Sequence, residues 1–232
     1  MMAPTMHDTL AQYLDRPAWF ALTGPQSALA QGSPAAWRIN PGYGPFAAAA
    51  PGHDAALAGL LRDHDDEIWT VEDNGVSPPG TIVRKTAVLT QMVAQRYAEP
   101  DPDQTFILLG ETDVPDMTAL ALATRPGPWG PLTWRYGPFY GLRHEGRLIA
   151  MAGERLRPGP GLVEVSGVCT DPAFRGQGLA RKLICHVMAG HRARGLTTFL
   201  HSYADNDGAI ALYRAIGFVE RSQRVVTILG KA

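Results

Sequence analysis

The sequence predicts an α/β (α+β) fold, and three observations support this prediction. First, 45% of the 232 residues are hydrophobic and 19% are charged, which is enough apolar material for a sizeable core. Second, segments in which apolar and polar residues alternate, as they do in strands, are interspersed along the chain with segments of helical periodicity. Third, the apolar run 162–170 passes through Gly176 and Gly178 into the amphipathic run 180–194, as a strand that turns into a helix would.

The second part of the chain, residues 106–232, has the more regular pattern and is predicted as one domain. The predicted elements are strand 106–110, helix 116–124, strands 139–144, 147–157 and 162–170, helix 179–194, strand 197–203, helix 206–216 and strand 218–229. Glu145-Gly146 joins two of these strands as a hairpin turn, which makes His144 a hairpin residue.

Residues 1–105 are predicted as an N-terminal lobe with many glycine and proline breaks. The elements expected there are a helix over 53–62, strands over 67–71 and 81–89, and a linker over 100–103. His64 stands among acidic residues, but such a charge run is usually a solvated face, so no metal site is expected.

Charge is unevenly distributed along the chain, although the formal net charge is only -1. Residues 1–110 hold 6 Lys and Arg against 12 Asp and Glu, whereas residues 111–232 hold 15 against 10. The positive second part suits an anionic ligand, and the opposite signs also suit electrostatic docking of the two parts. Because the basic residues are scattered, no nucleic-acid partner is expected.

Cys169 and Cys185 are the only cysteines, and neither has a spaced partner for a metal site or a disulfide framework. A reduced, cytoplasmic setting is therefore the default expectation. Cys169 falls on the apolar side of its strand, which predicts a buried thiol rather than a nucleophile. No run reaches the ~20 apolar residues of a membrane span, and no leader pattern is present, so a soluble protein with no membrane partner is expected.

The turn from Arg175 to Ala180 carries the first functional signal. A strand that turns through glycines into a helix leaves unpaired main-chain N–H groups at the positive end of the helix dipole, which is a ready site for phosphate. The turn lacks the Gly-Lys-Ser/Thr of a mononucleotide loop and the third glycine of a dinucleotide fingerprint. Taken alone, it is equally well explained as a tight connection.

A second signal follows in residues 206–218. Asn206 is placed as the N-cap of a helix and Gly217 as its C-terminal stop, while Tyr213 shares one helical face with Leu212 and Ile216. In isolation, Tyr213 could simply be a core tyrosine with its hydroxyl at the rim.

Together the two segments resemble the acetyl-CoA signature of the GNAT N-acetyltransferase superfamily, over about residues 106–232. Residues 175–180 are similar to that family's pyrophosphate loop, and 206–218 to its Asn-x-x-Ala-x-x-Leu-Tyr-x-x-x-Gly-Phe helix. The resemblance implies the GNAT fold, with helices on both faces of a mixed, mostly antiparallel sheet that splays open where the cofactor inserts. It also implies that residues 1–105 are a candidate degenerate copy of that fold, although no intact pyrophosphate loop is visible there.

The resemblance assigns roles toward acetyl-CoA as cosubstrate. The backbone of Val168, Cys169 and Thr170 would pair with the pantetheine arm and the thioester oxygen. Asn206 would contact pantetheine, and the Tyr213 hydroxyl would lie near the sulfur. The amides that would hold the pyrophosphate belong to Arg175, Gly176, Gln177, Gly178, Leu179 and Ala180.

The chemistry of acyl transfer to an amine agrees with these roles. Tyrosine, with an ordinary pKa of about 10, stays protonated at neutral pH and can donate to a leaving thiolate. Glu164 is the candidate general base, since strict alternation puts it on one face with Ser166, Val168 and Thr170. An ion-paired or solvated glutamate is the alternative reading. The alternatives for the base itself, His201 and Tyr203, share a face of the next strand.

The function that the sequence predicts is transfer of acetyl from acetyl-CoA to a primary amine of a small molecule or peptide by direct attack. Alternatives are a non-catalytic acyl-CoA-binding regulatory protein, a longer acyl group, or a hydroxyl acceptor. The loop 125–132 and the aromatic residues near it are the candidate acceptor wall, or else the buried seam between the lobes. These residues are Trp129, Trp134, Tyr136, Phe139 and Tyr140. Acceptor identity and oligomeric state are left open by the sequence.

Overall fold

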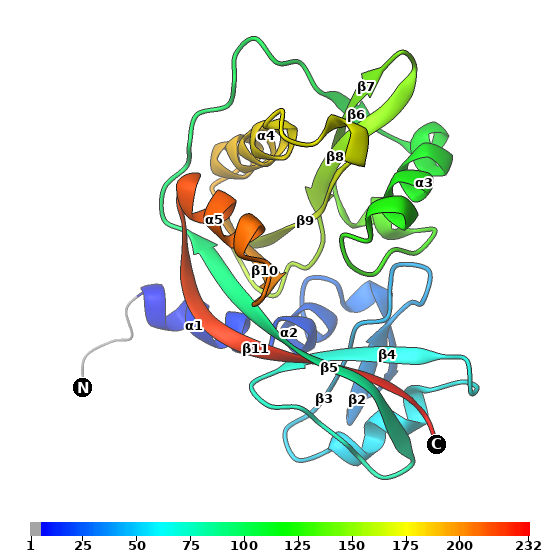
Figure 1. Ribbon diagram of the computed structural model, residues 1–232. Coiled ribbons are helices and arrows are strands. Elements are labelled where there is room, and N and C mark those ends of the chain that lie inside the picture. Colours follow the sequence, from blue (N-terminus) through cyan, green and yellow to red (C-terminus); the bar gives the residue numbers. More distant parts are fainter. Residues whose placement is uncertain (1–5) are drawn as a thin grey trace.

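The computed structural model describes residues 6–232 (Figure 1). The helices of this part of the chain are α1 (Met6–Asp15), α2 (Pro17–Thr23), α3 (Val114–Thr124), α4 (Leu179–Ala193) and α5 (Asp207–Ala215). The strands are β1 (Ala30–Ser33), β2 (Ala36–Ile39), β3 (Ala47–Ala49), β4 (Glu67–Glu72), β5 (Thr81–Ala94), β6 (Ile107–Leu109), β7 (Phe139–His144), β8 (Arg147–Glu154), β9 (Leu162–Thr170), β10 (Thr197–Tyr203) and β11 (Phe218–Lys231).

The core of the protein is one sheet with strand order β4-β11-β5-β10-β9-β8-β7-β6. Its neighbouring strands are antiparallel except for β9 and β10, which run parallel. These two strands pair only where Leu162–Glu164 meets Thr197–Phe199, and beyond these residues they separate. The mixed, mostly antiparallel and splayed sheet confirms the fold class expected from the sequence.

Helices cover both faces of the sheet. Helix α4 packs on β8, β9 and β10, and α5 packs on β11 (Figure 1). Their cluster includes Leu183, Met188 and Phe218. On the opposite face, α3 packs on β8 and β9, while α1 and α2 contribute to a second cluster around Phe199. The small sheet β1-β2-β3 lies against β4 through Phe46, which forms a bridge with Trp69.

Strand β5 belongs to the predicted N-terminal lobe, yet it lies inside the main sheet between β10 and β11. It pairs with β11 along almost its whole length and with β10 over residues 89–93. The expected division after residue 105 therefore falls in a connection between two strands of one continuous sheet. Ion pairs also join the two parts: Asp15 contacts Arg221 and Arg224, and Lys182 contacts Asp101.

Local patterns predicted most elements of the second part correctly. Strands β7, β9 and β10 have the expected bounds, and Glu145 and Gly146 form the hairpin turn with positive φ values of 49° and 80°. In the first part, the helix expected over 53–62 is a 3₁₀ helix, Asp54–Leu60, and β5 is five residues longer than expected. The sequence pattern did not predict α1, α2 or β1 to β3. Helix α2 has 7 residues and each of the three strands has 4 or fewer, which is too short for a clear periodicity.

Candidate active site

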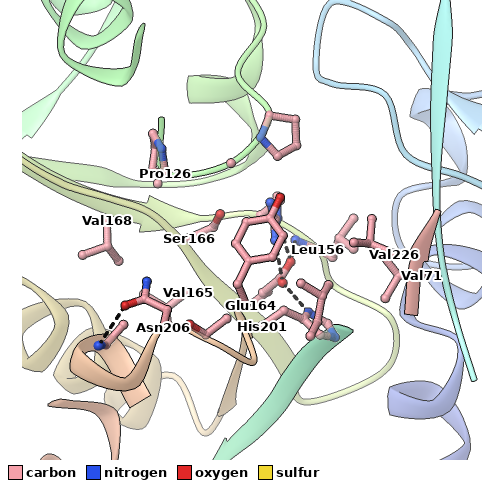
Figure 2. A pocket seen from close by; sticks show the side chains of 18 of the residues that line it. Val71, Pro126, Leu156, Glu164, Val165, Ser166, Val168, His201, Asn206 and Val226 are labelled. Atoms are coloured by element: carbon pink, nitrogen blue, oxygen red, sulfur yellow. Dashed lines mark hydrogen bonds and ion pairs between the residues drawn. The ribbon is translucent and has the colours of Figure 1, made fainter. Parts of the chain in front are cut away.

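A pocket of about 330 Å³ opens where β9 and β10 separate. Figure 2 shows Val168 and Asn206 at one end of it, Val71 and Val226 at the other, and Glu164, Ser166 and His201 between them. A second groove follows the glycine turn before α4. The two hollows adjoin each other, because both are lined by Thr124, Val168, Ala180 and Leu212.

The glycine turn presents free main-chain donors to the second groove. No described residue accepts a hydrogen bond from the N–H groups of residues 176–181, and Lys182 is the first residue of α4 whose N–H bonds back, to Gly178. Gly176 and Gly178 have φ values of 79° and 74°, and a Cβ at either would meet nothing within 4 Å. The turn therefore forms a bare cradle of donors at a helix N-terminus, which fits a pyrophosphate.

Strand β9 is interrupted by a bulge, which corrects the alternation expected from the sequence. Opposite it, Met151 pairs with Cys169 and Gly153 with Ser166, so Ala152 faces two residues of β9. The φ of Gly167 is 61°, a conformation that suits glycine.

Because the bulge adds one residue, the side chains of β9 after it point to the opposite faces of the sheet from those that strict alternation predicts. Val168 packs with Val165 in the α4 cluster, so it is not on the face of Glu164, and Cys169 packs against α3 instead. The prediction of a single face for Glu164, Ser166, Val168 and Thr170 was therefore wrong, because a bulge inserts one residue. Since β10 pairs with β9 only up to Glu164, the edge of residues 165–170 toward β10 is open to an extended ligand.

Helix α5 brings two of the predicted residues to the pocket. Asn206 accepts a hydrogen bond from the N–H of Ala209 through Oδ1, so it is the N-cap that the sequence predicted (Figure 2). Tyr213 packs edge-on against Phe218, with ring centroids 5.9 Å apart, and also lines the pocket. Burial raises the pKa of Tyr213 to about 12, so its phenol remains a proton donor across the neutral range.

Glu164 is buried and fully engaged, so the ion-paired reading of this residue is the one observed. Arg155 donates to its two oxygens at 2.9 and 2.8 Å, and His201 Nδ1 lies 2.8 Å from Oε1. Its side chain has no exposed surface. Although burial raises the pKa of Glu164, the charge of Arg155 and the hydrogen bonds of Arg155 and His201 outweigh it and lower this pKa to about 2.

His201 is held from its other side by Gln91 of β5. The Nε2 atom of Gln91 lies 2.7 Å from the Leu14 carbonyl and 3.0 Å from His201 Nε2, while Arg221 donates to Gln91 Oε1. This orientation makes the Gln91 amide a donor, so His201 Nε2 accepts and His201 Nδ1 donates to Glu164. Both imidazole nitrogens of His201 therefore have hydrogen-bond partners within the protein.

The loop expected to form an acceptor wall lines the pocket only in part. Residues 125–128 line the pocket, and Trp129 lines a neighbouring hollow. Phe139 and Tyr136 are buried, Trp134 packs against the α3 cluster, and Tyr140 stacks edge-on with His186. Most of these aromatic side chains therefore belong to the core.

Arg155 and Gln91 are the site residues that sequence reasoning missed. Arg155 follows β8, and its N–H bonds to the Glu164 carbonyl across the β8–β9 hairpin, so hairpin register could have paired the two. Gln91 carries no local signal, because its neighbour His201 comes from a distant strand.

The cysteines are both free and buried, as predicted for Cys169, whose pKa burial raises to about 12. Within residues 6–232, no group of three or more His, Cys, Asp or Glu side chains is arranged to hold a metal ion. In the same range, no helix combines the length and the apolar character needed to cross a membrane.

Comparison with known proteins shows the family of this chain. Residues 104–218 match the model of the acetyltransferase (GNAT) family. A solved structure from Novosphingobium aromaticivorans, assigned to the GNAT family, is 57% identical and superposes with a TM-score of 0.92 over 95% of this chain and 99% of that chain. The chain therefore belongs to the GNAT family of acetyltransferases, a class of acyltransferase enzymes.

Two curated relatives are similar to the second part of the chain. N-alpha-acetyltransferase RimI of Mycobacterium tuberculosis is 36% identical over 99 residues, which are 39% of this chain and 61% of the relative. The ribosomal protein bS18-alanine N-acetyltransferase of Escherichia coli is 31% identical over 129 residues, 52% of this chain and 84% of the relative. Neither alignment spans the whole of this chain.

Proposed function

We propose that this protein is an acetyl-CoA-dependent N-acetyltransferase that moves acetyl to a primary amine of a small molecule or peptide by direct attack. The observation that carries the proposal is that the groove beside the free amides of residues 176–181 adjoins the pocket that contains Tyr213. A pyrophosphate in the cradle would direct the pantetheine arm along the open edge of β9 toward Tyr213. The two curated relatives acetylate amines, as their names state, which supports an amine acceptor.

The residues of the pocket fit the steps of direct transfer. Acetyl-CoA supplies the thioester, the amine nitrogen forms a bond to its carbonyl carbon, and the bond from that carbon to sulfur breaks. Tyr213 donates a hydrogen bond to the leaving sulfur, and free main-chain donors of β9 stabilise the charge on the carbonyl oxygen. Cys169 is buried with a raised pKa, so an acyl-cysteine route has no suitable nucleophile.

The proton of the incoming ammonium needs a different acceptor from the one first considered. Glu164 was the candidate base, but its oxygens accept from Arg155 and His201, and its pKa of about 2 leaves it a weak base. We therefore assign Glu164 the task of orienting Arg155 and His201, and we assign the proton to water in the pocket.

Thiol release from acetyl-CoA with a panel of amines tests the proposal, using the wild type beside Tyr213→Phe. We expect Tyr213→Phe to lower kcat roughly 100-fold or more, since it removes the proton donor, while acetyl-CoA affinity changes little. Tyr140→Phe is the matched control, because Tyr140 packs on His186 outside the pocket.

Reversing charge at the turn tests the placement of the cofactor. Arg175 is exposed beside the cradle, so Arg175→Glu should weaken acetyl-CoA binding in calorimetry. Tight acetyl-CoA binding without release of thiol by any amine would point instead to a non-catalytic acyl-CoA-binding protein.

A further inference from the structure

The end of the pocket that lies away from the pyrophosphate groove is apolar and is built largely by the first part of the chain (Figure 2). Trp69 and Val71 come from β4, Leu89 from β5, and Phe46 from the segment before β3. Val226 of β11 completes this wall. None of these residues lies within the range that matches the GNAT family model, so the wall comes from outside the matched part of the chain.

Arg155 places one free donor in this part of the pocket. Its Nε and Nη2 atoms are bound to Glu164, whereas Nη1 has no hydrogen-bond partner among the described residues. Nη1 is also not among the buried polar atoms that lack a partner, and the Arg155 side chain keeps 12% of its surface exposed. The open edge of the guanidinium is therefore Nη1, which lies beside the loop at Gly127, where a Cβ would be 3.7 Å from it.

We propose that the apolar end binds the acceptor, and that the acceptor is an amine with an apolar side chain and an adjacent amide carbonyl. The Nη1 atom of Arg155 would donate to the carbonyl oxygen while the apolar wall covers the side chain. This inference rests on the proposed function and narrows its acceptor to one chemical class.

Charge balance favours an amide over a free carboxylate. Arg155 and Glu164 form a buried pair with no net charge, and the Arg155 guanidinium lies over the Phe46 ring, 4.7 Å from its centroid. At Arg155 the pocket thus offers a donor for a neutral oxygen without an uncompensated charge, and the other arginine that lines the pocket, Arg125, belongs to the loop 125–128.

The amide can come from a free amino-acid amide or from the N-terminal residue of a peptide. A neighbouring hollow of about 560 Å³ shares Trp69 and Pro128 with the pocket and gives room for the residues that would follow in a peptide. The experiment therefore includes both sources.

The test measures kcat/KM of the wild type with four amines: leucinamide, 3-methylbutylamine, glycinamide and leucine. 3-Methylbutylamine has the same apolar group without the carbonyl. Because its amine has a pKa of about 10.4 and an α-amino group beside an amide has one of about 8, every kcat/KM is calculated on the concentration of unprotonated amine. On this basis leucinamide should exceed 3-methylbutylamine roughly 10- to 100-fold, the effect of one hydrogen bond from a charged donor. Leucinamide should also exceed glycinamide, which lacks the apolar group, and leucine, which carries a carboxylate. The peptide Leu-Gly-Gly-amide is compared with leucinamide to decide between a peptide and a free amino-acid amide. A high kcat/KM with either the peptide or leucinamide supports the proposal.

Variants distinguish a hydrogen bond from Arg155 to the acceptor carbonyl from a purely structural role of Arg155. Arg155→Met combined with Glu164→Gln removes both charges together, so that no unpaired charge stays buried. We expect the ratio between leucinamide and 3-methylbutylamine to fall to near one in this double variant. Glu164→Gln alone keeps Arg155 and should keep the ratio, even if its overall rate is lower.

A ratio near one in the wild type would overturn the inference, as would a ratio preserved without Arg155. It would also be overturned if hexanoyl-CoA were used ten times faster than acetyl-CoA and no amide preference were seen, because the wall would then hold the acyl chain. These results differ from failure of the proposed function, in which no amine releases CoA at all.

Discussion

At the scale of single residues, the site depends on a buried carboxylate held by two strands and a loop. Glu164 is bound by Arg155 and His201, and His201 is bound in turn by Gln91. Each member thereby fixes the orientation of the next. A charge without exposed surface is stable only when its partners are in place, so loss of one member affects both folding and the geometry of the pocket.

The lowered pKa of Glu164 predicts a defined acid sensitivity. Its pKa is about 2 in the folded protein and 4.5 ordinarily, so the stability it contributes is complete above about pH 4.5 and is lost as the pH falls from there toward 2. We expect Glu164→Gln to lower the free energy of urea unfolding at pH 7 by about 3 to 5 kcal/mol, because Arg155 is left unpaired. The same variant should show a shallower decline between pH 5 and 3.

Two comparisons make this measurement specific. Glu154 also has a pKa lowered to about 2, through His191, Arg157 and Arg194, so part of the acid sensitivity should remain in Glu164→Gln. Glu220→Gln removes an exposed ion pair with Arg214 and should change stability by less than about 1 kcal/mol. An unchanged pH profile in Glu164→Gln would contradict the ion-paired assignment.

At the scale of elements, the turn into α4 needs backbone conformations that glycine adopts easily. Gly178 has φ 74° with open space around it, so a methyl group there meets no protein atom but strains the backbone that forms the cradle. The first turn of α4 is left without a side-chain cap. The uncapped first turn and the strained glycine lower the stability of the helix end, and under the proposed function they keep its N–H groups available to the ligand.

Replacing the glycine before α4 and a glycine inside α4 by alanine distinguishes the effect on helix stability from the effect on ligand binding. We expect Gly178→Ala to lower stability by about 1 kcal/mol and to weaken acetyl-CoA binding clearly in calorimetry. Gly190→Ala, inside the same helix and also in open space, should instead raise stability by about 0.5 to 1 kcal/mol and leave binding unchanged. Equal effects of the two substitutions on binding would contradict the placement of the pyrophosphate.

At the scale of the whole molecule, β5 makes the two parts of the chain interdependent. It lies between β10 and β11, and among the strands of residues 6–232 the other partner of β11 is β4. A fragment of residues 106–232 would lose both neighbours of β11 and the Gln91 contact to His201. The positive and negative parts of the chain are also joined by ion pairs, which agrees with the charge asymmetry.

Expression of the fragment 106–232 alone tests this interdependence. We expect no cooperative thermal transition in circular dichroism, because β10 and β11 would expose unpaired edges and apolar faces. Co-expression with residues 1–105 should restore the transition. A fragment that unfolds cooperatively and binds acetyl-CoA would instead support residues 106–232 as an independent domain.

Local sequence determined the elements of the second part and the local structure of the two segments proposed to bind acetyl-CoA, because periodicity, capping residues and glycine turns act over a few neighbouring positions. Asn206, Gly176 and Gly178 were found this way, and their geometry is as expected. The tertiary structure alone decided the bulge at Gly167, the insertion of β5 and the pairing of Arg155, Glu164, His201 and Gln91. These three features depend on contacts between strands that are distant in sequence. Such contacts determine which side chains are buried and which charges meet, and no single segment of the sequence contains that information.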